Sequence, residues 1–145
     1  MQWVDRNWGL LSRLMRGHAA LYRATNGWLG HRVPGFAPML LLDHVGARSN
    51  VRRTTPLLYG EDGENVVIVA SKGGYPKNPA WFYNLGAHPD TTIQVGRERR
   101  AVHARVAEPA ERQRLWDMMV SVYGGYRAYQ KRTEREIPIV VLEPR

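Results

Sequence analysis

Residues 91–107 read TTIQVGRERRAVHARVA and decide the fold class, because they match two strands joined by a tight turn. The first arm is residues 91–95, and a Gly-Arg-Glu turn follows at residues 96–98. Glycine suits such a turn because it adopts a positive φ without strain. In the second arm, residues 99–107, apolar and polar side chains alternate, as in a strand with one buried and one solvated face. This pattern is typical of an antiparallel sheet.

Four further runs of strand length surround this hairpin. Residues 39–45 and 138–142 are mostly apolar, and residues 54–59 and 65–70 flank GEDGE (60–64), which is a second hairpin signal. Six strands joined mostly by tight turns predict a mainly β fold with flanking helices. A small barrel or roll fits this order better than a parallel βαβ sheet does.

Helical patterns flank the strands. Residues 1–30 carry apolar side chains at helical spacing with arginines on the opposite side, which predicts a basic amphipathic helix. Three roles fit such a helix: it covers the core, lies on an anionic membrane, or closes over a ligand. A helix over residues 79–85 is expected to take Asn78 as its N-cap, and a later helix is expected to break at Gly124-Gly125. We therefore expect an N-terminal helix (1–30) and one barrel domain (31–145).

The composition narrows the chemistry. The chain has 145 residues, a formal net charge of +8 and a sequence pI of about 10.3. Nucleic acid, an anionic membrane surface or an acidic small molecule would each match that charge. The sequence has no cysteine, no G-x-S-x-G motif and no histidines at metal-ligand spacing, so we expect no thiol, serine-hydrolase or metal site. A cofactor that carries the chemistry itself is then favoured.

The connection GARSNVRRTTP, residues 46–56, concentrates three arginines and several hydroxyl side chains between two predicted strands. Guanidinium groups, hydroxyls and backbone N–H groups together suit a phosphate. A solvated basic turn would have the same composition, so both interpretations stay open on these residues alone. The motifs of P-loop and Rossmann sites are absent.

The stretch ASKGGYPKNPAWFYNL, residues 70–85, ends a predicted strand and then brings together two glycines, two prolines and four aromatic residues before Asn84. Glycine lets a flat ring or a phosphate approach the backbone closely. A structural turn followed by a capped helix would explain Asn78 and Pro79, but it would leave Ser71-Lys72-Gly73-Gly74 unexplained.

Three tyrosines, Tyr123, Tyr126 and Tyr129, follow one another at a spacing of three, which places them on one broad side of a helix. They would either line a pocket for an aromatic substrate or pack on the core.

Taken in order, these motifs resemble those of the deazaflavin-dependent nitroreductase family, which uses coenzyme F420. The matching patterns are G-x-R-S-x-x-x-R-T-T-P-L from residue 46, A-S-K-G-G-x-P-K-N-P-x-W from residue 70 and Y-x-x-Y-x-x-Y-Q-x-x-T-x-R-x-I-P-I-V-V-L-E-P from residue 123. The resemblance implies a split β-barrel related to FMN-binding barrels. It also implies an oxidoreductase that transfers a hydride from reduced F420 to a quinone or nitroaromatic acceptor.

The resemblance further implies a cofactor site formed by both loops and the helix after them. Its implied members are Arg48, Ser49, Arg53, Thr54, Thr55, Pro56, Ala70, Ser71, Lys72, Gly73, Ala80, Trp81, Phe82, Tyr83 and Asn84. The loop with Arg48 and Arg53 would hold the phosphate and acidic tail. The row Tyr123, Tyr126 and Tyr129 would face the acceptor, with Tyr126 and Ser71 as the catalytic hydrogen-bond donors.

The loop departs from the family pattern at Ala47, Asn50 and Val51, where a basic residue, Lys and Gly are common, so phosphate contact is expected to rest on Arg48 and Arg53. Two alternatives stay open. One is an FMN-dependent split-barrel oxidoreductase, and the other is a non-enzymatic basic barrel that binds nucleic acid by stacking. Three arginines in one loop favour F420, whose tail is more acidic than anything on FMN, and we expect no nucleic-acid partner.

The hydropathy of the sequence indicates where in the cell the protein is expected. No apolar run reaches the roughly 20 residues of a spanning helix, and charged residues interrupt the first turns of the chain, so a cytoplasmic protein is expected. Peripheral attachment to the inner face of the cell membrane through residues 1–30 is an added hypothesis. Either a monomer or a homodimer is compatible with the pattern.

Overall fold

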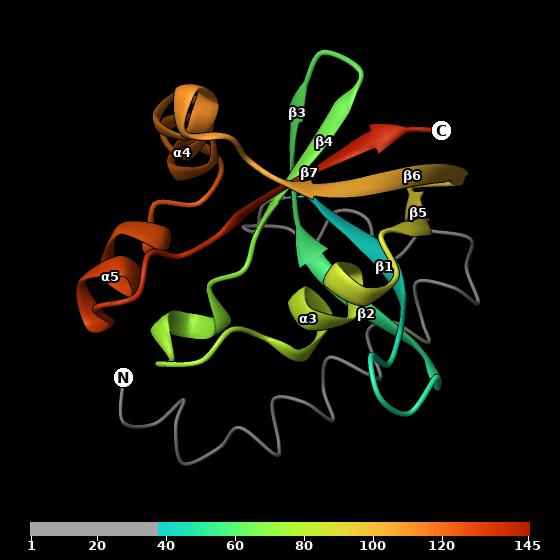
Figure 1. The fold of residues 1–145 in the computed structure, drawn as a ribbon. Coiled ribbons are helices and arrows are strands. Elements are labelled where there is room, and N and C mark those ends of the chain that lie inside the picture. Colours follow the sequence, from blue (N-terminus) through green and yellow to red (C-terminus); the bar gives the residue numbers. More distant parts are fainter. Residues whose placement is uncertain (1–37) are drawn as a thin grey trace.

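The computed structural model describes residues 38–145, and it contains one antiparallel sheet in the strand order β2-β1-β5-β6-β7-β4-β3 (Figure 1). The predicted helix over residues 1–30 lies outside the described residues. The strands are β1 (Met39–Val45), β2 (Arg52–Leu58), β3 (Gly60–Asp62), β4 (Asn65–Val69), β5 (Asp90–Val95), β6 (Glu98–Val106) and β7 (Ile139–Pro144).

The helices all follow β4 or β6. They are the 3₁₀ turn η1 (Lys72–Gly74), α3 (Ala80–Ala87), α4 (Pro109–Val122) and α5 (Gly125–Arg132). The break between α4 and α5 falls at Tyr123 and Gly124, which confirms the predicted interruption at the glycine pair. None of the helices in residues 38–145 is long and apolar enough to cross a membrane.

The path of the chain explains why the sheet curls. β2 and β3 are the two outermost strands, yet only Tyr59 separates them in sequence. The chain therefore brings the two edges of one sheet together, which a flat sheet of seven strands would not allow. The resulting curled, split-barrel arrangement confirms the predicted fold class.

The hairpin predicted between residues 54–59 and 65–70 is wrong in its first arm. β4 pairs with the short strand β3, with Gly60 opposite Val67, whereas β2 pairs along its whole length with β1. The chain bends at Tyr59, and Gly60 then lies so close to α4 that an added Cβ would come within 2.8 Å of the Met119 sulfur. Packing against α4 therefore separates β3 from β2, and nothing in the sequence between them indicates this.

Two apolar clusters fill the molecule. The inner cluster lies within the curl and includes Leu40, Leu42, Val66, Ile68, Ile93, Val140 and Leu142, with Trp81 and Leu85 of α3. The outer cluster lies between the sheet and the helices α4 and α5, and it includes Val67, Val69, Ile139, Val141, Leu115, Met119 and Tyr126. Because β4 and β7 contribute to both clusters, their runs NVVIV and IVVL are apolar on both faces.

Candidate active site

The arginine loop, residues 46–51, is a closed turn between β1 and β2. The Gly46 N–H donates to the Val51 carbonyl at 2.9 Å, the Asn50 N–H donates to the Gly46 carbonyl at 3.0 Å, and Asn50 has φ of 57°. The Ser49 side chain folds back over Gly46, where an added Cβ would collide with the Ser49 hydroxyl, and it accepts the Val51 N–H at 3.2 Å. The Ser49 hydroxyl therefore keeps its own proton for another acceptor.

Arg48 and Arg53 are exposed, and the side chain of neither forms a hydrogen bond or ion pair with another residue in the described part of the chain. Residues 46–60 contain no acidic side chain. Two guanidinium groups that form no ion pair with the described residues, together with the proton of the Ser49 hydroxyl, make a donor set that suits a phosphate or a row of carboxylates. The residues present thus fit the anionic part of a cofactor.

The second loop, residues 70–78, is held from behind by Arg135. Its guanidinium donates to the carbonyls of Ser71 at 2.8 Å, Tyr75 at 2.9 Å and Ala70 at 3.3 Å, and to Oδ1 of Asn78 at 2.7 Å. The N-cap of α3 is Pro79 and no side chain caps the helix, so the predicted N-cap Asn78 is wrong, and its side chain binds Arg135 instead. One arginine therefore fixes the shape of this loop.

The segment that carries Arg135 is fixed in turn by Gln130 of α5. The Gln130 amide donates to the Arg135 carbonyl at 2.8 Å and accepts the Ile137 N–H at 3.0 Å. Arg132 adds a further donor to the Gly73 carbonyl at 3.0 Å. α5 therefore supports the loop through two side chains, directly through Arg132 and indirectly through Gln130.

The front of the second loop is open. Lys72 and Gly73 have φ of 46° and 63°, and an added Cβ on Gly73 would meet no atom of residues 38–145 within 4 Å. Lys72 is not a glycine, so its positive φ is held at some energetic cost by the surrounding contacts. The Ser71 hydroxyl makes no hydrogen bond within residues 38–145. This face offers a hydroxyl donor and an ammonium group, which lies over the Tyr75 ring at 5.6 Å.

Helix α3 turns its predicted site residues in different directions. Trp81 and Asn84 are buried, and Trp81 belongs to the inner cluster. Phe82 is partly buried and contacts the ring of Tyr83 edge-to-face at 5.7 Å, while Tyr83 and Ala80 are exposed. Tyr83 and Phe82 are therefore the aromatic side chains of α3 that remain accessible to a ligand.

A buried polar chain connects the arginine loop, α3 and both strands β1 and β2. The Ala47 N–H donates to Oδ1 of Asn84 at 2.9 Å, Nδ2 of Asn84 lies 2.9 Å from Nδ1 of His44, and Nε2 of His44 lies 2.8 Å from Oγ1 of Thr55. Burial, then the charge of Arg53, lowers the pKa of His44 to about 4, with a small opposite effect of Asp43. His44 is therefore neutral near pH 7.

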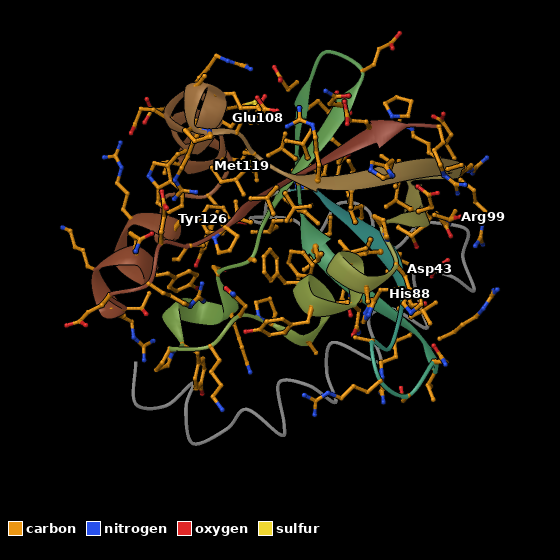
Figure 2. The ribbon with its side chains drawn as sticks, viewed as in Figure 1. Asp43, His88, Arg99, Glu108, Met119 and Tyr126 are labelled. Atoms are coloured by element: carbon orange, nitrogen blue, oxygen red, sulfur yellow. The ribbon has the colours of Figure 1, made fainter. Side chains whose placement is uncertain are left out.

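Thr54 lies next to Thr55 but on the other side of β2. Its hydroxyl donates to Oδ1 of Asp43 at 2.7 Å, and Arg99 contacts the other oxygen of that carboxylate at 3.3 Å. Figure 2 shows Asp43 and Arg99 side by side at the edge of the molecule, well away from Tyr126. Thr54 is therefore engaged in a surface ion-pair cluster.

The three tyrosines meet at the junction of α4 and α5. The ring of Tyr126 packs edge-to-face on Tyr123 at 5.2 Å, and the hydroxyls of Tyr123 and Tyr129 are 2.9 Å apart. Tyr126 is only 4% exposed and lies against Met119 in the outer cluster (Figure 2). Burial raises the pKa of Tyr126, and burial with the Tyr123 hydrogen bond raises that of Tyr129 to about 12. Both phenols are thus neutral donors rather than bases.

The tyrosines lie beside the second loop. An added Cβ on Gly74 would come within 2.7 Å of the Tyr129 carbonyl, so α5 and η1 touch at a point where only glycine fits. The structure thus brings Tyr129 next to the loop that carries Ser71.

Comparison with known proteins supports one family. A family model described as F420H(2)-dependent quinone reductase matches residues 14–144. The chain belongs to this family. An F420H(2)-dependent quinone reductase of Mycobacterium tuberculosis (strain ATCC 25618 / H37Rv) is 46% identical over 147 residues, covering 99% of this chain and 97% of the relative.

Solved structures agree with this assignment of the quinone reductase family. An F420-H2 dependent reductase (FDR-A) superimposes with a TM-score of 0.68 at 37% identity, covering 73% of this chain and 94% of that one. A structure described as a domain-swapped dimer has a TM-score of 0.71 at 32% identity, covering 91% and 98% of the two chains. The predictions of an F420-dependent oxidoreductase that reduces a quinone, and of F420 as its cofactor, are therefore confirmed.

Sequence reasoning missed two residues of this quinone reductase. Arg135 lies within the third motif, but the sequence analysis assigned it no role. His44 was considered only as a metal ligand. A polar residue inside the apolar run MLLLDHV was the available signal for His44, but its partner Asn84 is 40 positions away. Among the residues that the structure describes, no group of three or more His, Asp and Glu could hold a metal ion.

Proposed function

We propose that this quinone reductase holds F420 between the arginine loop, the second loop and α3, and that the acceptor binds on the tyrosine side. The observation that carries this proposal is that hydrogen bonds hold each of the two loops in place. Asn84 ties the arginine loop to α3, and Arg135 ties the second loop, which leads into α3, to the segment after α5. Residues that are up to 65 positions apart in sequence therefore fix the shape of the second loop.

When bound, reduced F420 supplies the hydride. Arg48 and Arg53 bind its anionic part, and the open face of Ser71, Lys72 and Gly73 orients the flat ring. The neutral phenol of Tyr126 and the hydroxyl of Ser71 donate hydrogen bonds to negative charge that develops on the acceptor oxygen. No covalent catalyst is required in this scheme, so the work of the chain is orientation and charge stabilisation.

A binding titration tests the cofactor site directly. The purified chain is titrated with F420 and, separately, with FMN, and ligand fluorescence is followed. We expect F420 to bind much more tightly than FMN. The double variant Arg48→Gln/Arg53→Gln should weaken F420 binding by at least about tenfold, because two charge-assisted contacts are lost.

The matched control for this titration is Arg97→Gln/Arg127→Gln, which removes the same charge from exposed positions outside the arginine loop. Its F420 affinity should stay close to that of the wild type. Equal weakening in both double variants would indicate only general electrostatic attraction, and tight FMN binding would contradict the proposed site.

We also propose that a nitroaromatic is reduced by the same path when it fits the acceptor side, and that residues 1–30 attach the protein to anionic membranes where lipid quinones reside. Flotation of the full chain with vesicles that contain anionic lipid checks the second part, and flotation with neutral vesicles is the control. If the protein floats with neither kind of vesicle, the proposed membrane attachment is rejected.

The oligomeric state is also a proposal. A structure similar to this chain is described as a domain-swapped dimer. We propose a homodimer for this chain, and light scattering during gel filtration would measure its mass directly. A monomeric mass across the concentration range would reject the dimer.

A further inference from the structure

The polar chain from Ala47 to Thr55 has a direction that its first member sets. A backbone N–H can only donate, so the Asn84 atom that faces Ala47 must be the carbonyl oxygen, 2.9 Å away. The amide nitrogen of Asn84 must then face Nδ1 of His44, also at 2.9 Å. One fixed donor thus determines how the Asn84 amide is oriented.

The orientation of Asn84 then determines the tautomer of His44. Because the amide nitrogen is a donor, Nδ1 of His44 has to accept and carries no proton. The neutral ring therefore has its proton on Nε2, which donates to Oγ1 of Thr55 at 2.8 Å. A protonated Nδ1 would place two donors against each other inside the protein.

The series of hydrogen bonds ends at the Thr55 hydroxyl, whose proton is not used within the series. Oγ1 of Thr55 accepts from His44, and its own proton has no acceptor among residues 38–145. The neighbouring Thr54 differs, since its proton already goes to Asp43 at 2.7 Å. Of the two adjacent threonines, only Thr55 is left with a donor to offer.

We propose that His44 and Asn84 are positioning residues that hold the Thr55 hydroxyl as a hydrogen-bond donor to an acceptor atom of the bound cofactor. This inference rests on the proposed function and adds to it that the bound F420 reaches β2 at Thr55. Both positioning residues are buried, at 4% and 7% exposure, so they act through Thr55 and do not touch the cofactor. The same series of hydrogen bonds connects the arginine loop, through Ala47, to strand β2, which carries Thr55.

The first test needs no cofactor. Nitrogen NMR of the full chain with ¹⁵N-labelled histidine reports which ring nitrogen carries the proton. We expect the His44 signal, identified by its loss in His44→Gln, to show a proton on Nε2 and a bare Nδ1 at pH 7. A proton on Nδ1 would overturn the proposal whatever the cofactor does.

The second test is a double-mutant cycle on F420 affinity. Thr55→Val keeps the shape but removes the donor, and we expect F420 binding to weaken about tenfold, whereas Thr55→Ser should stay close to wild type. His44→Phe should weaken binding alone but add nothing to Thr55→Val, because its effect passes through the missing hydroxyl. His44→Gln, which keeps a donor and an acceptor, should recover part of the loss.

The controls separate this inference from the proposed function. His103→Gln replaces an exposed histidine that pairs with Asp90 on β5, and it should leave the affinity unchanged. Wild-type protein that fails to bind F420 would overturn both proposals. Wild-type protein that binds F420 as tightly as Thr55→Val does would overturn this inference alone, and additive effects in the cycle would do the same.

Discussion

The inner and outer clusters are both apolar, but they are closed in different ways. The outer cluster is covered by α4 and α5, and the fully buried side chains of α4 in it, Leu115 and Met119, are apolar. The inner cluster ends beneath α3 in the buried polar chain of His44 and Asn84. Buried polar groups are costly unless every donor meets an acceptor. The comparison suggests that the outer side supplies stability, whereas the inner end gives up apolar packing for directed hydrogen bonds beside the site.

The largest effect should come from the outer cluster. Leu115→Ala empties a fully buried position and is expected to lower the free energy of unfolding by about 3 kcal/mol. Urea denaturation measures the loss, and Ser121→Ala, at an exposed position of the same helix, is the control. F420 affinity of the folded variant should not change. A parallel loss of affinity would mean that the two clusters are not separate in function.

A smaller effect should follow at the second loop. Arg135→Met keeps much of the length of the side chain but leaves the carbonyls of Ser71 and Tyr75 without their donor. We expect about 2 kcal/mol less stability, together with weaker F420 binding. Arg127→Met, at an exposed position of α5, is the matched control. Lost stability with unchanged affinity would show that the loop does not depend on Arg135 for its binding shape.

The polar closure of the inner cluster should also make stability depend on pH. The pKa of His44 is lowered from 6.5 to about 4 in the folded state, so the unfolded chain takes up this proton first as the pH falls. The folded state therefore loses up to about 1.4 kcal/mol per pH unit between pH 6.5 and 4, with no contribution above that window.

The difference between wild type and His44→Gln isolates this pH effect. Asp62, Asp90 and Glu111 also have lowered pKa values, owing mainly to hydrogen bonds from Arg114, His103 and Arg105, but both proteins share them. Unfolding in urea at several pH values should give a difference that changes only through the His44 window. A flat difference would show that His44 is not buried in its neutral form.

The smallest expected effect concerns Tyr126, at which the division of roles between the inner and outer clusters does not hold. Tyr126 belongs to the outer cluster, yet we propose that it donates to the acceptor. Tyr126→Phe should leave stability nearly unchanged and lower turnover about fivefold, or about 1 kcal/mol of transition-state stabilisation, with F420 affinity unaffected. Steady-state kinetics with a soluble quinone measures this, with Tyr83→Phe as a comparison. Unchanged turnover would leave Tyr126 as packing only.

Elements were predicted well where the signal was local, although six strands were expected and the sheet has seven. The Gly-Arg-Glu turn between β5 and β6 and the break before α5 lie within a few residues of the structural boundaries. The bend at Tyr59 was missed because it depends on Met119, 60 positions later. Asn78 was assigned as a cap because its neighbours permit one, whereas Arg135 binds it from 57 positions away. The features of the fold that were missed therefore depend on contacts between residues far apart in sequence, which local patterns do not reveal.

The same limit applies to the site. Motif resemblance assigned both loops and α3 to one cofactor site, which stays a prediction, and it gave equal weight to Trp81, which is core, and to Tyr83, which is exposed. Helical periodicity over eight residues does not decide which face of α3 meets the barrel. Roles for the individual residues of the site stay predictions until the titrations above are made.

The two edge strands of the sheet, β2 and β3, affect how readily one molecule associates with another. An unpaired strand edge can recruit a strand from another molecule and start aggregation. Here one outermost strand is only three residues long, and the other carries Arg52, Arg53 and Pro56, a residue that has no N–H to donate. Charge and proline at such positions discourage strand addition. The stretch that contributes to the proposed cofactor site therefore also protects the sheet from growing at its edge.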